Sequence, residues 1–160
     1  MNAVEVARPP AVVVRVLSSI VVAAMRTPLK SVLKEFMVLR FTGRKTGRRY
    51  EVPVTAHRGD GTLMAQTGAP WRVNFRGGRD VDVTVDGRTT PMRGVLVEHT
   101  QTVAETYQRW IEEIGIGRAP RQLGLKVTVP RVPTVEELTD AVEREHLAII
   151  WLKPRDAGEA

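Results

Sequence analysis

The chain has 160 residues, which suits one domain, because a chain of this size buries about 68–70% of the surface that its unfolded form exposes. It contains no cysteine, which excludes disulfides, thiolate metal sites and a cysteine nucleophile and is compatible with the cytoplasmic location that we predict. The formal charge is +6 and the sequence pI is near 10.3, so we expect an acidic partner: nucleic acid, an anionic membrane surface, or a phosphorylated or carboxylated small molecule.

The segment 10–26 is apolar, with Arg15 inside it. Its uninterrupted apolar runs are shorter than the roughly 20 residues that span a bilayer, and its start lacks the basic region of a signal peptide. Helical spacing gathers Arg15, Ser18, Ser19 and Arg26 on one face. We predict a helix that packs on the domain's own core, with peripheral contact with the inner face of the membrane as the alternative.

The remaining elements follow in chain order. Thr27-Pro28 begins a short second helix through Lys34. Apolar and alternating patterns predict strands, whereas Thr102–Ile114 has helical spacing and Thr134 opens a capping box for a helix toward Arg144. Gly115–Pro133, rich in Gly, Pro and Arg, is predicted to be irregular. The predicted strands are 36–41, 50–56, 62–67, 80–85, 88–98 and 147–152.

Two turn signals refine the strand predictions. Asp86-Gly87 is typical of a tight hairpin turn between two of the strands. Pro91 and Gly94 indicate an edge position or a bulge for the strand after it. Together the elements predict an α+β domain with a small barrel of about six mostly antiparallel strands. We divide the chain into an N-terminal helical segment at 1–35, a barrel domain at 36–155 and a polar tail at 156–160.

A basic turn, Gly43–Arg49, separates the first two predicted strands. Five of the ten residues from Arg40 to Arg49 are Arg or Lys and none is acidic. Two glycines and Thr46 lie within this charge, so the turn can offer charge-assisted donors to phosphate or carboxylate groups. It is one residue shorter than a P-loop and lacks the Gly-Lys-Ser/Thr ending, which argues against nucleotide triphosphate hydrolysis.

A second candidate segment runs from Thr67 to Phe75. Trp71 offers a flat apolar surface there, and Asn74 carries an amide that can orient a loop. The sequence has no serine nucleophile motif, and its three histidines, His57, His99 and His146, lack the paired spacing of metal ligands, so no metal is expected.

These two segments resemble a known family. Phe41–Gly47 with Pro53-Val54 is similar to the Thr-Gly-Arg-Lys-Ser-Gly segment and following Pro-Leu of the deazaflavin-dependent nitroreductase family, and Gly68–Phe75 is similar to its Gly-Gly loop and Trp-Tyr-x-Asn-Leu segment. The resemblance implies a split β-barrel of the FMN-binding type and coenzyme F-420 as cofactor, with FMN as the alternative. This coenzyme joins a flat deazaflavin ring to a phospholactate and an oligoglutamate tail.

By position, the resemblance assigns three groups of cofactor-binding residues. Basic residues and a threonine would hold the phosphate and tail, two short segments would border the ring through backbone groups, and a tryptophan would form a wall. These residues are, in turn, Arg44, Lys45, Thr46 and Arg49; Pro53, Val54 and Thr55 with Gln66, Thr67, Gly68 and Ala69; and Trp71. Asn74 would orient the loop. The chain departs from the family at Tyr50, Thr55, Thr67 and Arg72, which affects substrate choice more than cofactor binding.

The implied activity is hydride transfer from the reduced coenzyme to an activated small-molecule acceptor, an enone, quinone or nitroaromatic. Tyr50 and Tyr107 are the candidates for a proton donor, because a phenol can supply a proton. A carrier that binds the coenzyme without turnover is one alternative. A nucleic-acid-binding module that uses the same basic turn is another, which an aromatic content of 5% disfavours, so no nucleic acid is expected.

Overall fold

The computed structural model describes residues 2–6, 36–59 and 62–155, and these residues form two compact units. Within the described residues, the helical unit comprises 2–6, 66–68 and 97–149, and the sheet unit comprises 36–59, 62–65, 69–96 and 150–155. The helices predicted at 10–26 and 27–34 and the tail at 156–160 lie outside the described residues. The domain boundaries at residues 35 and 155 stay a prediction.

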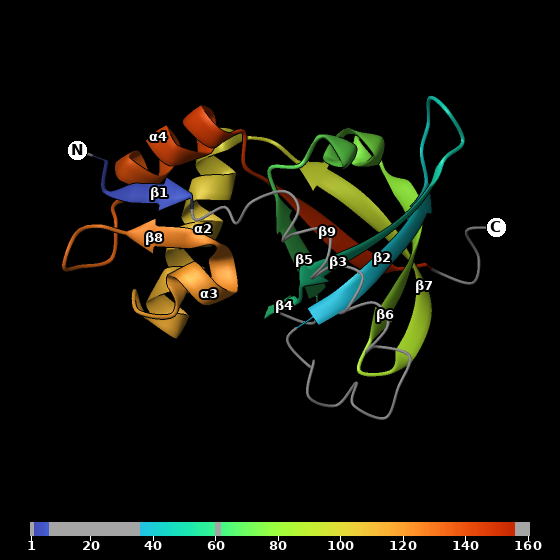
Figure 1. Ribbon diagram of the computed structural model, residues 1–160, viewed down its shortest axis with the longest axis horizontal. Coiled ribbons are helices and arrows are strands. Elements are labelled where there is room, and N and C mark those ends of the chain that lie inside the picture. The colour runs from blue at the N-terminus through green and yellow to red at the C-terminus, as the bar shows by residue number, and fades with distance from the viewer. Residues whose placement is uncertain (1, 7–35, 60–61, 156–160) are drawn as a thin grey trace. The chain divides into compact units, whose positions relative to one another are not determined.

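The sheet unit contains most of a curled sheet of seven strands (Figure 1). The pairs β3–β2, β2–β6, β6–β7 and β5–β4 are antiparallel. Every predicted strand is present, and the predicted α+β class with its half-barrel sheet is confirmed. In spatial order the strands are β3 (Arg49–Thr55), β2 (Phe36–Thr42), β6 (Arg79–Val85), β7 (Arg88–Val97), β9 (Ala148–Pro154), β5 (Thr62–Thr67) and β4 (His57–Gly59).

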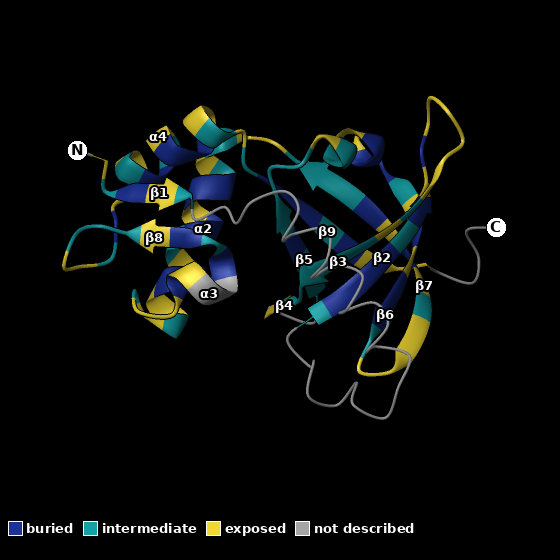
Figure 2. Cartoon of the chain, in the orientation of Figure 1, coloured by how far each residue is buried: buried dark blue, intermediate teal, exposed yellow. Residues whose placement is uncertain are grey.

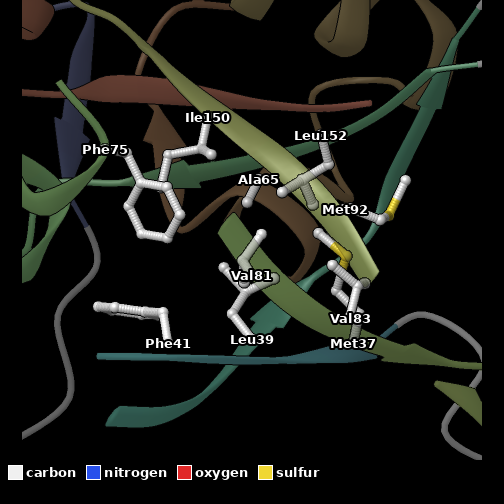
Figure 3. Packing of buried hydrophobic residues seen from close by; sticks show 10 residues of the cluster. All are labelled: Met37, Leu39, Phe41, Ala65, Phe75, Val81, Val83, Met92, Ile150 and Leu152. Carbon is white, nitrogen blue, oxygen red and sulfur yellow. The ribbon is translucent and has the colours of Figure 1, made fainter. Parts of the chain in front are cut away.

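Alternation along the strands explains how this sheet forms its core. In β2 the side chains of Met37, Leu39 and Phe41 are buried in one cluster, whereas Arg40 and Thr42 between and after them are more exposed. The same period of two runs through β6, β7 and β9, so their apolar side chains meet the cluster from several strands (Figure 3). The cluster consists of Met37, Leu39, Phe41, Ala65, Phe75, Val81, Val83, Met92, Ile150 and Leu152.

The hairpin between β6 and β7 confirms the predicted turn. Asp86 and Gly87 have φ of 51° and 75°, the positive values of a type I′ turn, which matches the twist of the two strands. The turn sets a continuous register from Val85 opposite Arg88 to Arg79 opposite Gly94. The fixed register places side chains of β6 and β7 in known pairs.

The prediction of an edge or bulge at Pro91 and Gly94 was wrong. β7 lies between β6 and β9 in the sheet order, and its pairing with β6 is uninterrupted. Gly94 serves packing instead, because a Cβ there would lie 2.6 Å from a ring carbon of Phe75 and 3.2 Å from Ile150. A glycine in a strand can mark a close approach as well as a bulge, and here the neighbour is an aromatic ring.

The helical unit combines three helices with a two-stranded sheet. Both long helices carry buried and exposed residues (Figure 2). Thr134 and Glu137 form the predicted capping box, with each side chain bonded to the other's backbone N–H, and Gly115 ends the long helix with φ of 86°. The elements are β1 (Val4–Val6), α2 (Thr100–Ile114), α3 (Ala119–Leu123), β8 (Leu125–Val127) and α4 (Val135–Glu145).

The segment 115–133, predicted to be irregular, contains both α3 and β8. The strand forms because Leu125–Val127 pairs with Val4–Val6, more than a hundred residues earlier in the chain. Leu125 and Val4 are each 1% exposed, so the pair also contributes to the core. Pairing over this sequence distance leaves no local pattern, and the sequence-based prediction was therefore wrong here.

Candidate functional site

The basic turn joins β2 to β3 and is closed by its own backbone. The N–H of Gly43 donates to the Arg48 carbonyl at 2.7 Å, and the N–H of Gly47 donates to the Gly43 carbonyl at 3.2 Å. Gly47 has φ of 69°, a value that glycine adopts without strain. All residues from Arg44 to Arg49 are exposed. The turn therefore holds a defined backbone while its cations face solvent.

Asn74 fixes this turn to a neighbouring segment, as expected. It lies in the 3-10 helix η2 (Pro70–Phe75) and is 8% exposed. Its Oδ1 accepts the Arg44 N–H at 2.9 Å, and its Nδ2 donates to the Trp71 carbonyl at 2.8 Å. Both halves of the amide are used, so a buried side chain connects the turn to η2 without an unsatisfied polar atom.

Four aromatic rings lie together beneath the turn. Phe41 stacks on Tyr50 with ring centroids 5.0 Å apart and an interplanar angle of 5°. Phe41 also contacts Trp71 at 5.7 Å and Phe75 at 4.8 Å. Trp71 and Tyr50 are only half-buried, and the Arg48 guanidinium lies 5.5 Å from the Tyr50 ring centroid. The predicted ring-wall residue thus belongs to an aromatic group that also supports the turn.

Three arginines donate to backbone carbonyls near the start of β6. Arg44 Nη2 donates to Gly78 at 3.0 Å, Arg93 Nη2 to Gly77 at 3.5 Å, and Arg79 Nη2 to Thr42. Gly78 has φ of 95°, and a Cβ there would lie 2.6 Å from Arg93 Nη2. Glycine at 78 therefore allows the Arg93 guanidinium to lie against the backbone.

A pocket of about 510 Å³ lies beside these carbonyls. Side chains from β2, β6 and β7 and the residue after β9 line it, and most of them are charged. The charged lining residues are Arg40, Arg79, Arg93, Arg155, Asp80 and Asp82. Four guanidiniums face two carboxylates, so the pocket is positive overall, but its charge is less concentrated than that of the turn.

Ion pairs occupy part of this lining. The Asp80 carboxylate lies 3.3 Å from Arg93 and 3.7 Å from Arg155. Arg40 lies 3.1 Å from Glu51 and also donates to Thr84 Oγ1 at 2.7 Å. Within the described ranges, no carboxylate pairs with Arg79, and no donor bonds to Asp82.

The remaining predicted site residues belong to β3 and to the segment before η2. Pro53, Val54 and Thr55 lie in β3, an edge strand that tolerates proline, and all three are half-buried. Gln66–Gly68 belongs to the helical unit, whereas Ala69 begins the segment of the sheet unit that leads into η2. The grouping of Gln66–Ala69 with the turn around one ring stays a prediction.

Tyr107, one of the two proposed proton donors, lies in the core of α2. It is 1% exposed, its ring packs edge to face on Trp110 at 5.4 Å, and burial raises the pKa of its phenol. This environment is that of a packing residue. Tyr50, the other candidate, lies at the turn.

The histidines have structural positions. His99 caps α2 by accepting the Thr102 N–H, and His146 ends α4 with φ of 54°. His57 is half-buried in β4, and burial lowers its pKa to about 4, so it is neutral near pH 7. No group of three or more potential metal ligands occurs in the part of the chain that the structure describes.

Sequence reasoning missed Arg93 and Arg155 as members of a site. For Arg93 a signal existed, because the predicted turn at Asp86-Gly87 sets the hairpin register and places Asp80 opposite Arg93. Arg155 had no such signal, since β9 reaches the sheet from a distant part of the chain. Among the described residues, no helix has the length and apolar character that a membrane crossing needs.

Comparisons with known proteins give similarity in structure but none in sequence. No protein-family model matches the chain, and no curated protein matches it. The solved structures to which it is similar include an F-420-H2-dependent reductase, FDR-A, at 15% identity with a TM-score of 0.46, covering 75% of this chain and 95% of that one. Another F-420 reductase matches at 13% identity and a TM-score of 0.40, covering 79% and 93%. The conserved hypothetical protein Rv2991 from Mycobacterium tuberculosis matches at 13% identity and a TM-score of 0.44, covering 98% and 86%.

Proposed function

We propose that the chain is an oxidoreductase that uses coenzyme F-420 and reduces an activated small-molecule acceptor such as an enone, quinone or nitroaromatic. The observation that carries this proposal is the basic turn: Asn74 fixes its backbone through Arg44, while Lys45, Arg48 and Arg49 are exposed. A pre-organised turn with exposed cationic ends suits a ligand with several negative charges along one chain.

The residues at the turn fit the phospholactate and oligoglutamate end of the coenzyme. Lys45 and Arg49 have no acidic partner among the described residues, so an anionic tail meets positive charge that is not already neutralised. Arg44 has a different role, because its guanidinium donates to the Gly78 carbonyl. We assign tail binding to Lys45, Arg48 and Arg49, with Thr46 beside them, and turn geometry to Arg44.

The aromatic group beneath the turn fits the flat end of the coenzyme. Trp71 and Tyr50 retain exposed surface, whereas Phe41 and Phe75 behind them are buried. An aromatic face of this kind excludes water from a bound ring. When bound, the reduced coenzyme supplies a hydride from its deazaflavin ring. The chain's own part is to orient that ring, and the Tyr50 phenol is the candidate to deliver a proton to the acceptor.

A fluorescence titration of the purified chain with F-420, beside FMN and haem, tests binding. We expect low-micromolar affinity for F-420, and we expect the Lys45→Glu/Arg49→Glu variant to lose about a hundredfold, which corresponds to roughly 2.7 kcal/mol. Arg88→Glu/Arg109→Glu is the matched control, because it also reverses two exposed basic residues and both lie outside the turn. Equal losses in the two variants would point to overall charge, and a wild-type chain without F-420 binding would sink the proposal.

A second experiment separates catalysis from binding. The reduced coenzyme is mixed with the chain and a panel of enones, quinones and nitroaromatics, and its oxidation is followed by absorbance. Turnover that falls in the Tyr50→Phe variant, with unchanged coenzyme affinity, would assign the proton to Tyr50. Tight binding without oxidation across the panel would replace the proposed reductase by a carrier of the coenzyme.

A further inference from the structure

Two charged residues of the pocket lining, Asp80 and Arg93, lie on the outer face of the sheet. They are directly opposite each other in the register of β6 and β7, and opposite residues of antiparallel strands present their side chains on the same face. Val81, the next residue of β6, belongs to the core cluster, so Asp80 and Arg93 lie on the other face, and both are exposed. The pocket volume of about 510 Å³ is sufficient for a small molecule.

Arg155, the residue after β9, joins this pair. Its Nη2 lies 3.7 Å from Asp80 Oδ2, whereas Arg93 Nη1 lies 3.3 Å from Asp80 Oδ1. One carboxylate therefore lies between two guanidiniums, with one guanidinium at each of its oxygens. Among the described residues no second carboxylate pairs with either arginine, so two positive charges meet one negative charge, a net of +1. An anion in the pocket would meet the charge that Asp80 does not neutralise.

The Arg93 guanidinium is held by the backbone that precedes β6. Its Nη2 donates to the Gly77 carbonyl at 3.5 Å, and a Cβ at position 78 would lie 2.6 Å from the same nitrogen. Glycine at 78 therefore leaves the space that this guanidinium occupies. A guanidinium has five N–H donors, of which Asp80 and Gly77 each use one. Arg93 is thus positioned before a ligand arrives and keeps donors for it, which lowers the entropic cost of binding.

We propose that this pocket binds a phosphate-type oxyanion between the Arg93 and Arg155 guanidiniums. The Asp80 carboxylate lies within ion-pair distance of both, and a tetrahedral phosphate offers more acceptor oxygens than a carboxylate does. Asp80 gathers the two guanidiniums in the free chain and also limits the affinity, because its charge repels the bound anion. None of the residues assigned to tail binding lines the pocket, and the test needs no coenzyme.

The test is a nuclear magnetic resonance titration of the full ¹⁵N-labelled chain at constant ionic strength, with inorganic phosphate, methyl phosphate and acetate as probes. We expect saturable shifts at the amides of Gly78, Asp80 and Arg93 with phosphate, and a dissociation constant on the order of 1 mM. Acetate has fewer oxygens and is expected to bind about tenfold more weakly. Methyl phosphate that binds as tightly as phosphate would assign the site to the phosphoryl group of a small molecule, and weaker methyl phosphate would assign it to free phosphate.

Two variants should change the phosphate affinity in opposite directions. Arg155→Gln removes one of the two cations and should weaken phosphate at least about tenfold, whereas Arg88→Gln, outside the lining, should leave it unchanged. Asp80→Asn removes the competing negative charge and should tighten phosphate at least about fivefold. Asp86→Asn is its matched control, because Asp86 is also an exposed aspartate paired with an arginine, and it lies outside the lining.

These measurements separate the pocket from the basic turn and from overall charge. Shifts confined to residues 43–49 would overturn the proposal, because they would place the phosphate at the turn. Absence of saturable shifts, or acetate that binds as tightly as phosphate, would overturn it as well. So would an Asp80→Asn variant that binds phosphate no more tightly than Asp86→Asn, since both variants remove one negative charge.

Discussion

The basic turn and the arginine-lined pocket are both rich in cations, yet they suit different ligands. The turn takes its charges from one continuous stretch, Gly43–Arg49, in which four of the seven residues are Arg or Lys and none is acidic. The pocket collects arginines from β2, β6, β7 and the end of β9, and mixes them with aspartates. Contiguous like charge attracts an extended anion, whereas interleaved charge selects a compact one, so the arrangement of arginines matters more than their number.

The two units also differ in net charge. Among the described residues, the sheet unit has thirteen Lys and Arg residues against four Asp and Glu, a net of +9, and the helical unit has six against ten, a net of −4. The excess positive charge of the chain therefore resides in the unit that contains both the turn and the pocket. The experiments below change residues that support both the turn and the pocket, residues that support only one of them, or residues outside both.

The largest effect is expected from Phe75, which supports both regions. It is fully buried, packs on Phe41, which lines the pocket, and on Trp71 beside the turn. Phe75→Ala should lower the free energy of unfolding by about 3–5 kcal/mol, because it leaves a cavity in the core. Urea unfolding measures this. Val73→Ala, at an exposed neighbour, should change it by less than about 0.5 kcal/mol, and similar losses in both variants would contradict the prediction.

Lowering the pH should reduce the free energy of unfolding through His57. His57 has a pKa of about 4 in the folded chain against 6.5 for an ordinary histidine, because burial disfavours its charged form. The unfolded chain therefore binds a proton that the folded chain excludes as the pH falls from 6.5 toward 4, and the free energy of unfolding should decrease over that range by on the order of 2–3 kcal/mol.

Unfolding curves of the wild type and His57→Gln across this range measure the effect. The variant should lose the pH dependence that His57 contributes. A wild type whose stability is flat from neutral pH to about pH 4 would contradict the assignment.

Asn74 should distinguish the turn from the pocket. Asn74→Ala removes the acceptor of the Arg44 N–H and the donor to the Trp71 carbonyl, and should cost about 1–3 kcal/mol of stability. F-420 affinity should fall because the turn loses its anchor. Asn74→Asp keeps the acceptor and should bind F-420 more tightly than the alanine variant. An alanine variant that binds F-420 as tightly as the wild type would contradict the role of this anchor.

The smallest effect is expected in the helical unit. Thr134→Ala removes the N-cap of α4 and should cost about 1 kcal/mol. Thr139→Ala, within the same helix, is the control and should change stability by less. Neither variant should alter the affinity for F-420, since neither residue belongs to the turn or lines the pocket. A change in this affinity would indicate coupling between the units.

Local patterns predicted much of the fold, because they depend on neighbouring residues. The hairpin at Asp86-Gly87 follows from a turn geometry that few residue pairs adopt, and the capping box at Thr134 follows from two hydrogen bonds within one helical turn. Alternation in 80–85 agrees with the burial of Val81 and Val83, although Thr84 is buried as well. The irregular assignment of 115–133 failed because β8 exists only through its pairing with β1.

The sequence by itself determined the charge of the turn and its place between two strands, because five cations in ten residues on a glycine turn are a local property. Only the tertiary structure decided which of these cations are available. It directs Arg44 to the Gly78 carbonyl, leaves Lys45 and Arg49 exposed, and assembles the pocket from strands that are neighbours in the sheet but not in the chain. The reason is that the partners of a side chain are set by strand order, which long-range pairing establishes.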